Sequence, residues 1–204
     1  HANSETLLDG AFDDQEQGPK FVEAIHRNAA RLGNLVADLL DLSRIEAGQN
    51  SLELEPIKLA GAGSRATEAI GISAAKKGTE VVNAVPVDLA AMADMQALDQ
   101  VLLNLVENAV KYTPAGGQVT VCARVIGGRV RIEVEDDGPG VPAEHRARLF
   151  ERFYRVDPGR SKQMGGTGLG LAIVKHLVNS MGGTVGMTPA QTQGSIFWVE
   201  LPKA

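Results

Sequence analysis

Between residues 19 and 47, apolar side chains recur at alternating spacings of four and three residues, which is the pattern of a helix that buries one face. The stripe consists of Ile25, Ala29, Leu32, Val36 and Leu39. A single helix cannot bury such a stripe on itself. Its cover could be the residues before it, a second copy of the chain or a segment outside it. We favour a second copy, because only a short stub of helix precedes residue 19.

After residue 50 the pattern changes, since residues 51–57 alternate polar and apolar side chains as a strand does. We expect helices at 60–77, 95–112, 143–150 and 169–180, and strands at 80–83, 118–125, 129–135, 184–188 and 195–201. Helices combined with hairpin-connected strands predict an α+β fold with two layers. A boundary near residues 48–50 separates residues 1–48 from a linker with a first strand at 49–58 and a main domain at 59–204.

Composition excludes several classes of protein. A chain of 204 residues can bury roughly 70% of its unfolded surface, so it needs no disulfide or metal to fold. The single cysteine, Cys122, excludes an intrachain disulfide and a zinc site built on cysteines, and it fits a reducing, cytoplasmic setting. The net charge of −5 disfavours nucleic acid as a partner. No apolar run reaches the ~18 residues that would span a bilayer, and the first residues lack a signal-peptide pattern.

The helix predicted at 95–112 carries three polar side chains, Asn104, Asn108 and Lys111, on one face. Asparagine is a poor helix former, so local propensity is sacrificed along this stripe. Amide oxygens beside a lysine could hold a hard cation and a phosphate together. A plain solvated face is an equally good interpretation of this stripe taken alone.

A second cluster, Glu135-Asp136-Asp137-Gly138-Pro139-Gly140, follows a predicted strand. Glycines beside a carboxylate let the backbone approach a flat ligand while the carboxylate accepts a hydrogen bond. Asp136 would suit the exocyclic amino group of adenine and would repel the carbonyl oxygen of guanine. On its own, an ordinary turn rich in Asp and Gly is the more common explanation.

Four glycines in six residues run directly into the last predicted helix, in the segment from Gly165 to Leu171. Bare backbone N–H groups at a helix N-terminus form an anion site, for which phosphate is the expected occupant. A dinucleotide-binding fingerprint fails, because Ile173 stands at the sixth position counted from Gly168. A P-loop fails as well, because Leu171 stands where lysine is required.

Between these clusters lies Leu149-Phe150-Glu151-Arg152-Phe153-Tyr154-Arg155, which holds three of the eight aromatic residues of the chain. Aromatic anchors followed by cations predict a lid that closes over phosphates. The alternative is that the two phenylalanines belong to the core and the charges to an ordinary loop.

Together and in this order, the four segments resemble those of the sensor histidine kinases. Residues 104–112 resemble the N box, 136–140 the G1 box, 149–155 the F box and 166–170 the G2 box. The region from about 51 to 202 is similar to a complete ATP-binding domain of the Bergerat type, an α/β sandwich. Residues 5–48 resemble the end of helix one and all of helix two of the dimerisation domain. The most similar subgroup is that of phosphate-responsive or cell-wall sensors.

The resemblance implies roles for single residues. Asn108 would bind Mg²⁺ with Asn104 beside it, and Asn104, Lys111 and Arg155 would act in catalysis. The residues that would bind ATP are Asn108, Lys111, Tyr112, Asp136, Gly138, Gly140, Phe150, Tyr154, Arg155, Gly166, Thr167, Gly168, Leu169 and Gly170.

The implied activity is transfer of the ATP γ-phosphate to a histidine of the dimerisation domain, and then to an aspartate of a response regulator in two-component signalling. The implied partners are ATP, a response-regulator receiver domain and a second copy bound through helix 19–47. The whole protein would be anchored in the bacterial inner membrane, with this region in the cytoplasm.

The phosphoacceptor motif of that family, a histidine followed by an acidic residue and Leu-Arg-x-Pro, is absent from the sequence, so we expect this chain to lack its own acceptor. A hydrolytic relative would want glutamate in place of Asn104 to activate water. That argues against a gyrase, Hsp90 or MutL-like ATPase and against an anti-sigma serine kinase. A scaffold that binds nucleotide without catalysis is the alternative from another class.

Overall fold

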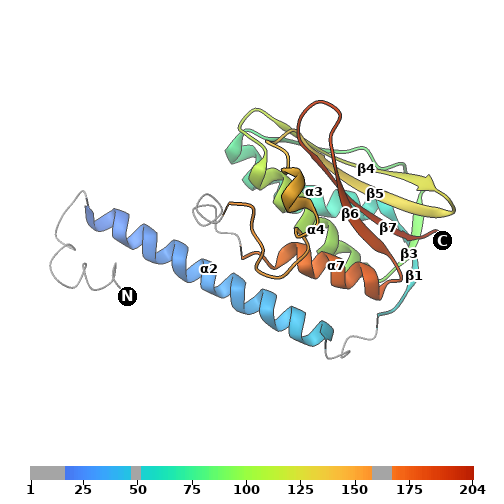
Figure 1. The fold of residues 1–204 in the computed structure, drawn as a ribbon, viewed down its shortest axis with the longest axis horizontal. Coiled ribbons are helices and arrows are strands. Elements are labelled where there is room, and N and C mark those ends of the chain that lie inside the picture. Colours follow the sequence, from blue (N-terminus) through green and yellow to red (C-terminus); the bar gives the residue numbers. More distant parts are fainter. Residues whose placement is uncertain (1–16, 47–51, 158–166) are drawn as a thin grey trace.

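The computed structural model describes residues 17–46, 52–157 and 167–204, which form one long helix beside a two-layer sandwich of helices and a sheet (Figure 1). The expected two-layer α/β fold is confirmed. The boundary predicted at residues 48–50 lies outside the described residues.

The main sheet has five strands in the order β2-β4-β5-β7-β6. They span β2 Glu80–Asn83, β4 Gln118–Ile126, β5 Arg129–Asp136, β6 Thr184–Pro189 and β7 Ser195–Pro202. Strands β2 and β4 pair in parallel, and the other neighbours pair antiparallel. The five strands predicted for this sheet are all present, with bounds shifted by a residue at most.

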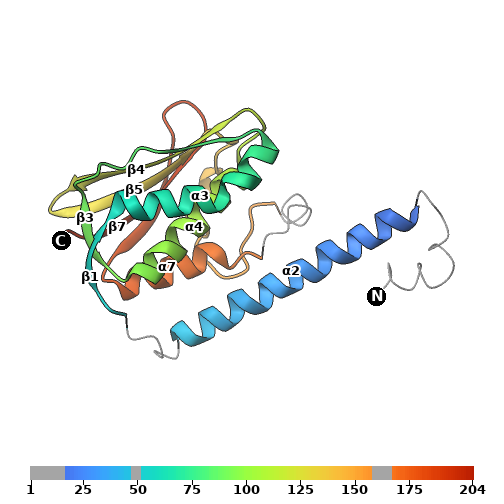
Figure 2. The ribbon, with the colours of Figure 1, turned by 180° about the vertical axis from the view of Figure 1, so that it is seen from behind.

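One face of the sheet forms the core. Val119 and Val121 on β4 alternate with polar residues, and so do Val130, Ile132 and Val134 on β5, and all five are buried. Successive side chains of a strand point to opposite faces, so this alternation places the apolar ones toward the helices. In both views the helices lie on that single side of the sheet (Figures 1 and 2).

Three helices cover this face: α3 (Leu59–Lys77), α4 (Met95–Tyr112) and α7 (Gly170–Ser180). Helix α4 lies between the other two and contacts both. Its buried side chains include Leu98, Leu102 and Leu105, so the core holds α4 in place along most of its length.

Both ends of α4 are hydrogen-bonded by side chains. Asp94 Oδ1 accepts from the N–H of Ala97 at 2.9 Å, and Lys77 Nζ donates to the carbonyl oxygens of Val110 and Lys111 at 2.6 and 2.7 Å. Helix termini leave such groups without intrahelical partners, so these bonds stabilise the bounds that the sequence predicted for this helix.

A second, two-stranded sheet joins β1 (Glu55–Lys58) to β3 (Ala90–Ala93) in antiparallel register. Strand β3 was not predicted, because alanine has low β propensity and only pairing with β1 makes this segment extended. Strand β1 starts later than the predicted strand at 51–57, and Leu54 before it is exposed.

The helix predicted at 143–150 is shorter in the structure. Helix α5 spans only Ala143–Arg146, and the chain continues in turns with hydrogen bonds between residues three apart. Such tight turns rarely continue as a regular helix.

The long helix α2 spans Gln17–Glu46 and lies along the outer side of α7 (Figure 2). Leu35 packs partly against the core, but Leu32, Val36 and Leu39 of the predicted stripe are more than half exposed. The described residues therefore leave most of this stripe uncovered.

Candidate functional site

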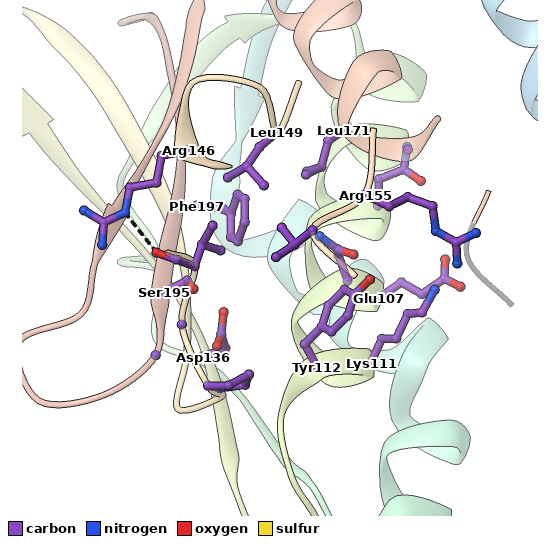
Figure 3. Close-up of a pocket in the computed structure, with 18 of the residues that line it drawn as sticks. Glu107, Lys111, Tyr112, Asp136, Arg146, Leu149, Arg155, Leu171, Ser195 and Phe197 are labelled. Carbon is purple, nitrogen blue, oxygen red and sulfur yellow. Dashed lines mark hydrogen bonds between the residues drawn. The ribbon is translucent and has the colours of Figure 1, made fainter. Parts of the chain in front are cut away.

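A cavity of about 1040 Å³ opens between α4, the end of β5 and the start of α7 (Figure 3). Small-molecule sites typically occupy about 300–1,000 Å³, so the space is sufficient for a ligand of nucleotide size. Its walls come from segments that are far apart in the sequence, and the core fixes α4 and α7 on either side.

Helix α4 turns polar side chains into the cavity while its other face packs in the core. Asn104, Asn108 and Lys111 line the cavity, together with Tyr112 at the end of the helix. Residues three and four apart share one face of a helix, and this spacing brings the two amides and the lysine into one column.

Asn104 also faces the start of α7. A side-chain carbon placed on Gly170 would lie 3.5 Å from Asn104 Oδ1, so the two segments approach each other closely. The Nδ2 atom of Asn104 is buried and has no hydrogen-bond partner among the described residues. A buried amide without a partner is costly unless a ligand or water completes it.

At the opposite end of the cavity, Asp136 closes β5 with a side chain that is 4% exposed. Its Oδ1 accepts a hydrogen bond from the N–H of Gly138 at 2.9 Å. Burial raises the pKa of Asp136 to about 6, and backbone N–H groups of Gly138 and Ser195 partly offset this rise. The carboxylate can thus serve as a buried acceptor at neutral pH.

Two glycines permit the close packing around Asp136. A side-chain carbon on Gly138 would lie 2.7 Å from Asp136 Oδ1, and one on Gly194 would overlap the carbonyl group of Asp136. Gly194 also has a φ of 110°, which side chains rarely tolerate. A larger residue at position 138 would displace the carboxylate of Asp136, and one at position 194 would displace the strand end that carries it.

Two glycines at the entrance to α7 expose backbone to the cavity. Thr167, Gly168 and Gly170 line it, and Gly168 has a φ of 78°. Leu169 is fully buried in the core, and its N–H donates to Thr167 Oγ1 at 3.2 Å. Backbone N–H groups at such a helix start attract anions.

The segment after α5 also lines the cavity, and its polar lining residues include Tyr154 and Arg155. The Nη2 atom of Arg155 is buried and has no hydrogen-bond partner among the described residues. Phe150 is half-buried and packs against the core, whereas Phe153 is 60% exposed. The alternative of core phenylalanines therefore holds for Phe150 and not for Phe153.

Most of the residues singled out from the sequence meet at this cavity: Asn104, Asn108, Lys111, Tyr112, Asp136, Gly140, Tyr154, Arg155, Thr167, Gly168 and Gly170. Three others do not line it, namely Gly138, Phe150 and Leu169. Gly166 lies outside the described residues.

Family models match both parts of the chain. Residues 93–204, more than half of the chain, match the model described as "Histidine kinase-, DNA gyrase B-, and HSP90-like ATPase". Residues 1–48 match "His Kinase A (phospho-acceptor) domain".

The chain belongs to the histidine kinase-, DNA gyrase B- and HSP90-like ATPase family.

Relatives of this ATPase-family chain carry histidine kinase names, which confirms the resemblance predicted above. "Sensor-like histidine kinase SenX3" of Mycobacterium tuberculosis (strain ATCC 25618 / H37Rv) is 37% identical over 199 residues, covering 98% of this chain and 48% of SenX3. The chain thus spans about half the length of that relative.

Two solved structures are similar to it. Full-length ShkA in complex with AMPPNP is 39% identical with a TM-score of 0.77, over 92% of this chain and 39% of ShkA. The mycobacterial sensor histidine kinase MprB is 31% identical with a TM-score of 0.64, over 74% of this chain and 98% of that structure.

Several cavity residues of this ATPase-family domain were missed from the sequence. Arg146 lines the cavity and donates from Nε to the carbonyl oxygen of Val141 at 3.0 Å, and Phe197 lines it from β7 (Figure 3). Neither stands in a pattern that marks a site, because a lone arginine and a strand phenylalanine are common. Gly194 had a signal, since it stands in a polar turn between two strands.

No helix in the described part of the chain is long and apolar enough to cross a membrane.

Proposed function

We propose that the chain is the ATP-binding catalytic region of a sensor histidine kinase, which transfers the γ-phosphoryl group of ATP to a histidine of the dimerisation domain. One observation carries this proposal. The amide-bearing face of α4 and the bare entrance of α7 border the same cavity, whose other end holds the buried carboxylate of Asp136. Such a cavity fits a ligand with a polar ring at one end and several anionic groups at the other.

Adenine would lie at the Asp136 end. Its exocyclic amino group would donate to the carboxylate, whereas the carbonyl oxygen of guanine would meet a second acceptor there. A buried carboxylate facing an acceptor is strongly unfavourable, so this contact would select ATP over GTP. Gly140 would let the backbone approach the ring closely.

The triphosphate would lie between α4 and α7. Lys111 and Arg155 would neutralise its charge, and the N–H groups at Gly168 and Gly170 would donate to its oxygens. Arg155 supports this assignment because its buried Nη2 atom has no partner among the described residues.

The residues also fit a magnesium ion held jointly with the phosphates. Asn108 offers a hard amide oxygen in the cavity, and Asn104 stands one turn away on the same face. The described residues contain no group of three or more His, Cys, Asp or Glu side chains that could hold a metal. Phosphate oxygens and water would supply the ligands beyond the amides, because Mg²⁺ usually keeps several waters. When bound, the ion would neutralise charge on the β- and γ-phosphates.

Phosphoryl transfer depends mainly on positioning and charge neutralisation, which these residues supply. The cavity has an amide at residue 104 and not a carboxylate, so it lacks a general base at the position where hydrolytic relatives activate water. An imidazole acceptor needs no such base at this position, because its ring nitrogen is itself the nucleophile. This combination favours transfer to histidine over hydrolysis.

The acceptor histidine would come from a phosphoacceptor domain. None of the histidines in the described part of the chain lines the cavity. The uncovered stripe of α2 would pair with a second copy, and a receiver domain of a response regulator would take the phosphoryl group onto an aspartate. In the whole protein these parts would lie on the cytoplasmic side of a membrane anchor.

The test is to mix the chain with Mg-ATP labelled at the γ-phosphate and a separately supplied phosphoacceptor domain. We expect an acid-labile, base-stable label on the acceptor and none on this chain alone. Binding of ATP without any labelling would contradict the kinase and support a nucleotide-binding scaffold.

A further inference from the structure

The segment between α5 and the cavity is built from repeated tight turns. The N–H groups of His145, Arg148, Glu151 and Tyr154 each donate to the carbonyl oxygen three residues earlier, at 2.9–3.3 Å. Turns of this kind bring side chains three residues apart onto one side. His145, Arg148, Glu151 and Tyr154 therefore form a series that starts in α5 and ends at the cavity wall.

The series is bent and not straight. A continuous run of such turns rises about 2 Å per residue, so nine residues would separate His145 from Tyr154 by about 18 Å. Instead, His145 Nδ1 and Tyr154 Oη share a hydrogen bond at 2.6 Å. The bond closes a ten-residue loop, and it can form only while the segment keeps this bend.

One further contact holds the ring of Tyr154. The guanidinium of Arg148 lies 4.3 Å from the ring centre, within the range of a cation–π interaction. Glu151 accepts a hydrogen bond from Arg148 Nε at 3.0 Å and so orients it. Both contacts to the Tyr154 side chain, from His145 and Arg148, come from its own loop.

The loop closed by this hydrogen bond ends next to a strained backbone position, Phe153. Phe153 has a φ of 61°, which is rare for a residue other than glycine, and its N–H donates to the carbonyl oxygen of Gly168 at 2.9 Å. Tyr154 and Arg155 follow directly and both line the cavity. A strained backbone persists only where its surroundings hold it, and the His145–Tyr154 bond is one of these constraints.

We propose that His145 is a positioning residue, whose hydrogen bond to Tyr154 holds Arg155 in place over the phosphates of the bound nucleotide. This inference rests on the proposed function for the identity of the ligand. His145 itself does not line the cavity, so it would act only through Tyr154 and the backbone of the loop.

The test uses the whole chain with three variants at the bond. His145→Phe keeps a ring and removes the hydrogen bond, His145→Asn restores a polar atom near the Nδ1 position, and Tyr154→Phe removes the bond from the other side. Glu144→Gln, an exposed residue of the same helix, is the matched control. Dissociation constants are measured for Mg-ATP and for adenosine, which has no phosphates.

We expect His145→Phe and Tyr154→Phe each to weaken Mg-ATP binding about three- to tenfold, the size of one lost hydrogen bond. The double variant His145→Phe/Tyr154→Phe should bind Mg-ATP no more weakly than either single variant. His145→Asn should recover most of the Mg-ATP affinity. Adenosine binding should stay within about twofold, because Asp136 is not part of the loop.

The proposal is overturned if His145→Phe leaves Mg-ATP binding unchanged, if the two effects add, or if adenosine binding falls as much as Mg-ATP binding. Amide hydrogen exchange without nucleotide keeps this test separate from the proposed function. His145→Phe should speed exchange at residues 151–155 and Glu144→Gln should not, even if the wild-type chain bound no ATP. Unchanged exchange would refute the structural part of the inference.

Discussion

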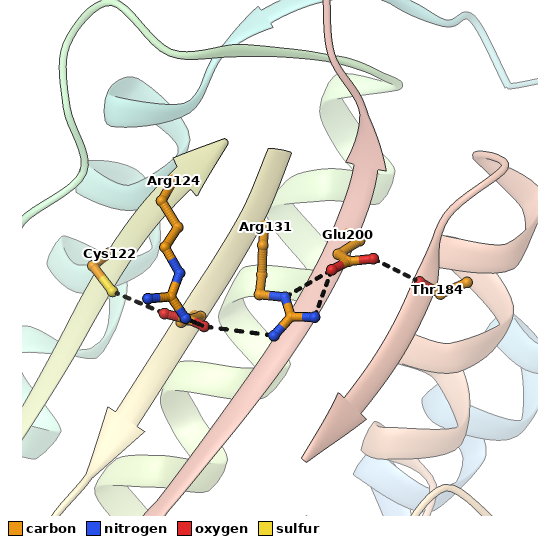
Figure 4. A network of polar contacts seen from close by, with 6 residues as sticks. Cys122, Arg124, Arg131, Thr184 and Glu200 are labelled. Carbon is orange, nitrogen blue, oxygen red and sulfur yellow. Dashed lines mark hydrogen bonds and ion pairs between the residues drawn. The ribbon is translucent and has the colours of Figure 1, made fainter. Parts of the chain in front are cut away.

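The face of the sheet turned away from the helices, here called the open face, differs from the cavity in how its charged groups are paired. On the open face, Arg131 pairs with Glu200 at 2.6 Å and Arg124 pairs with Glu133 at 2.6 Å (Figure 4). In the cavity beyond the other face, the amide of Asn104 and the guanidinium of Arg155 each keep a buried atom without a partner among the described residues.

The polar side chains of the open face form a connected network. Glu133 lies between Arg124 and Arg131, the thiol of Cys122 points to its other oxygen, and Glu200 continues to Thr184 (Figure 4). Because these groups already satisfy one another, the network stabilises the sheet and has little left to offer a ligand. In the cavity, one buried atom each of Asn104 and Arg155 has no partner among the described residues, which costs stability and is typical of a binding site. Mutations in the cavity should therefore change function, and mutations in the network should change stability.

The largest effect is expected at Asn108. Asn108→Ala should lower phosphoryl transfer to a supplied acceptor domain by about 10²–10³-fold, because the amide oxygen proposed to hold magnesium beside the transferring phosphoryl group is lost. The free energy of unfolding should change by less than about 0.5 kcal/mol. Label transfer and urea unfolding measure the two quantities, with exposed Asn179→Ala as the control. Normal transfer by Asn108→Ala would remove this residue from the site.

Asp136→Asn should reduce the preference for ATP over GTP by about ten- to a hundredfold, since an amide can donate to the guanine carbonyl and no longer repels it. Competition binding with the two nucleotides measures the ratio. If the ratio does not change, Asp136 does not contact the base.

The raised pKa of Asp136 makes binding depend on pH. Its carboxyl accepts a proton as the pH falls through about 6, so the acceptor for adenine is lost. Adenosine affinity should be constant above neutrality and about tenfold lower one unit below that pKa. In the nucleotide-free protein, the pKa is raised from 3.8, so ionisation of Asp136 costs stability as the pH rises from about 4 to 6. Binding that is flat from pH 5 to 8 would contradict the buried acceptor.

On the open face, Glu133→Gln should cost about 1–3 kcal/mol of unfolding free energy, because it leaves two arginines beside a neutral group. The Mg-ATP dissociation constant should not move. Exposed Glu135→Gln on the same strand is the control for urea unfolding. A change in nucleotide affinity without a change in unfolding free energy would contradict the assignment of stability to the open face and of ligand binding to the cavity.

The smallest effect is expected at Cys122. Burial raises the pKa of its thiol to about 11, and the carboxylate of Glu133 adds to the rise, so the group stays neutral and unreactive. Cys122→Ala should change both unfolding free energy and nucleotide affinity by less than about 0.5 kcal/mol. A loss of affinity would show that the faces are coupled.

The strength of the local sequence pattern explains which elements could be predicted. Helix α4 was predicted to its last residue because its apolar periodicity is unbroken and Asp94 caps its start. Strand β3 was missed because four residues dominated by alanine carry no strand signal of their own.

In the site, glycines and amides gave the sequence signal, because these residues are unfavourable in ordinary structure and need a reason to be there. Arg146 and Phe197 gave none, because their place in the cavity depends on tertiary packing alone. The bond between His145 and Tyr154 depends on a bend that no local pattern predicts. Sequence patterns therefore located the ligand-binding groups better than the residues that support them.

Titration calorimetry of the chain with ATP, in the presence and absence of magnesium, tests the central claim most directly. If α4 and the entrance of α7 hold the triphosphate together, the titration will saturate at one ATP per chain and magnesium will tighten it. A titration that shows no saturable binding with magnesium present would contradict the account.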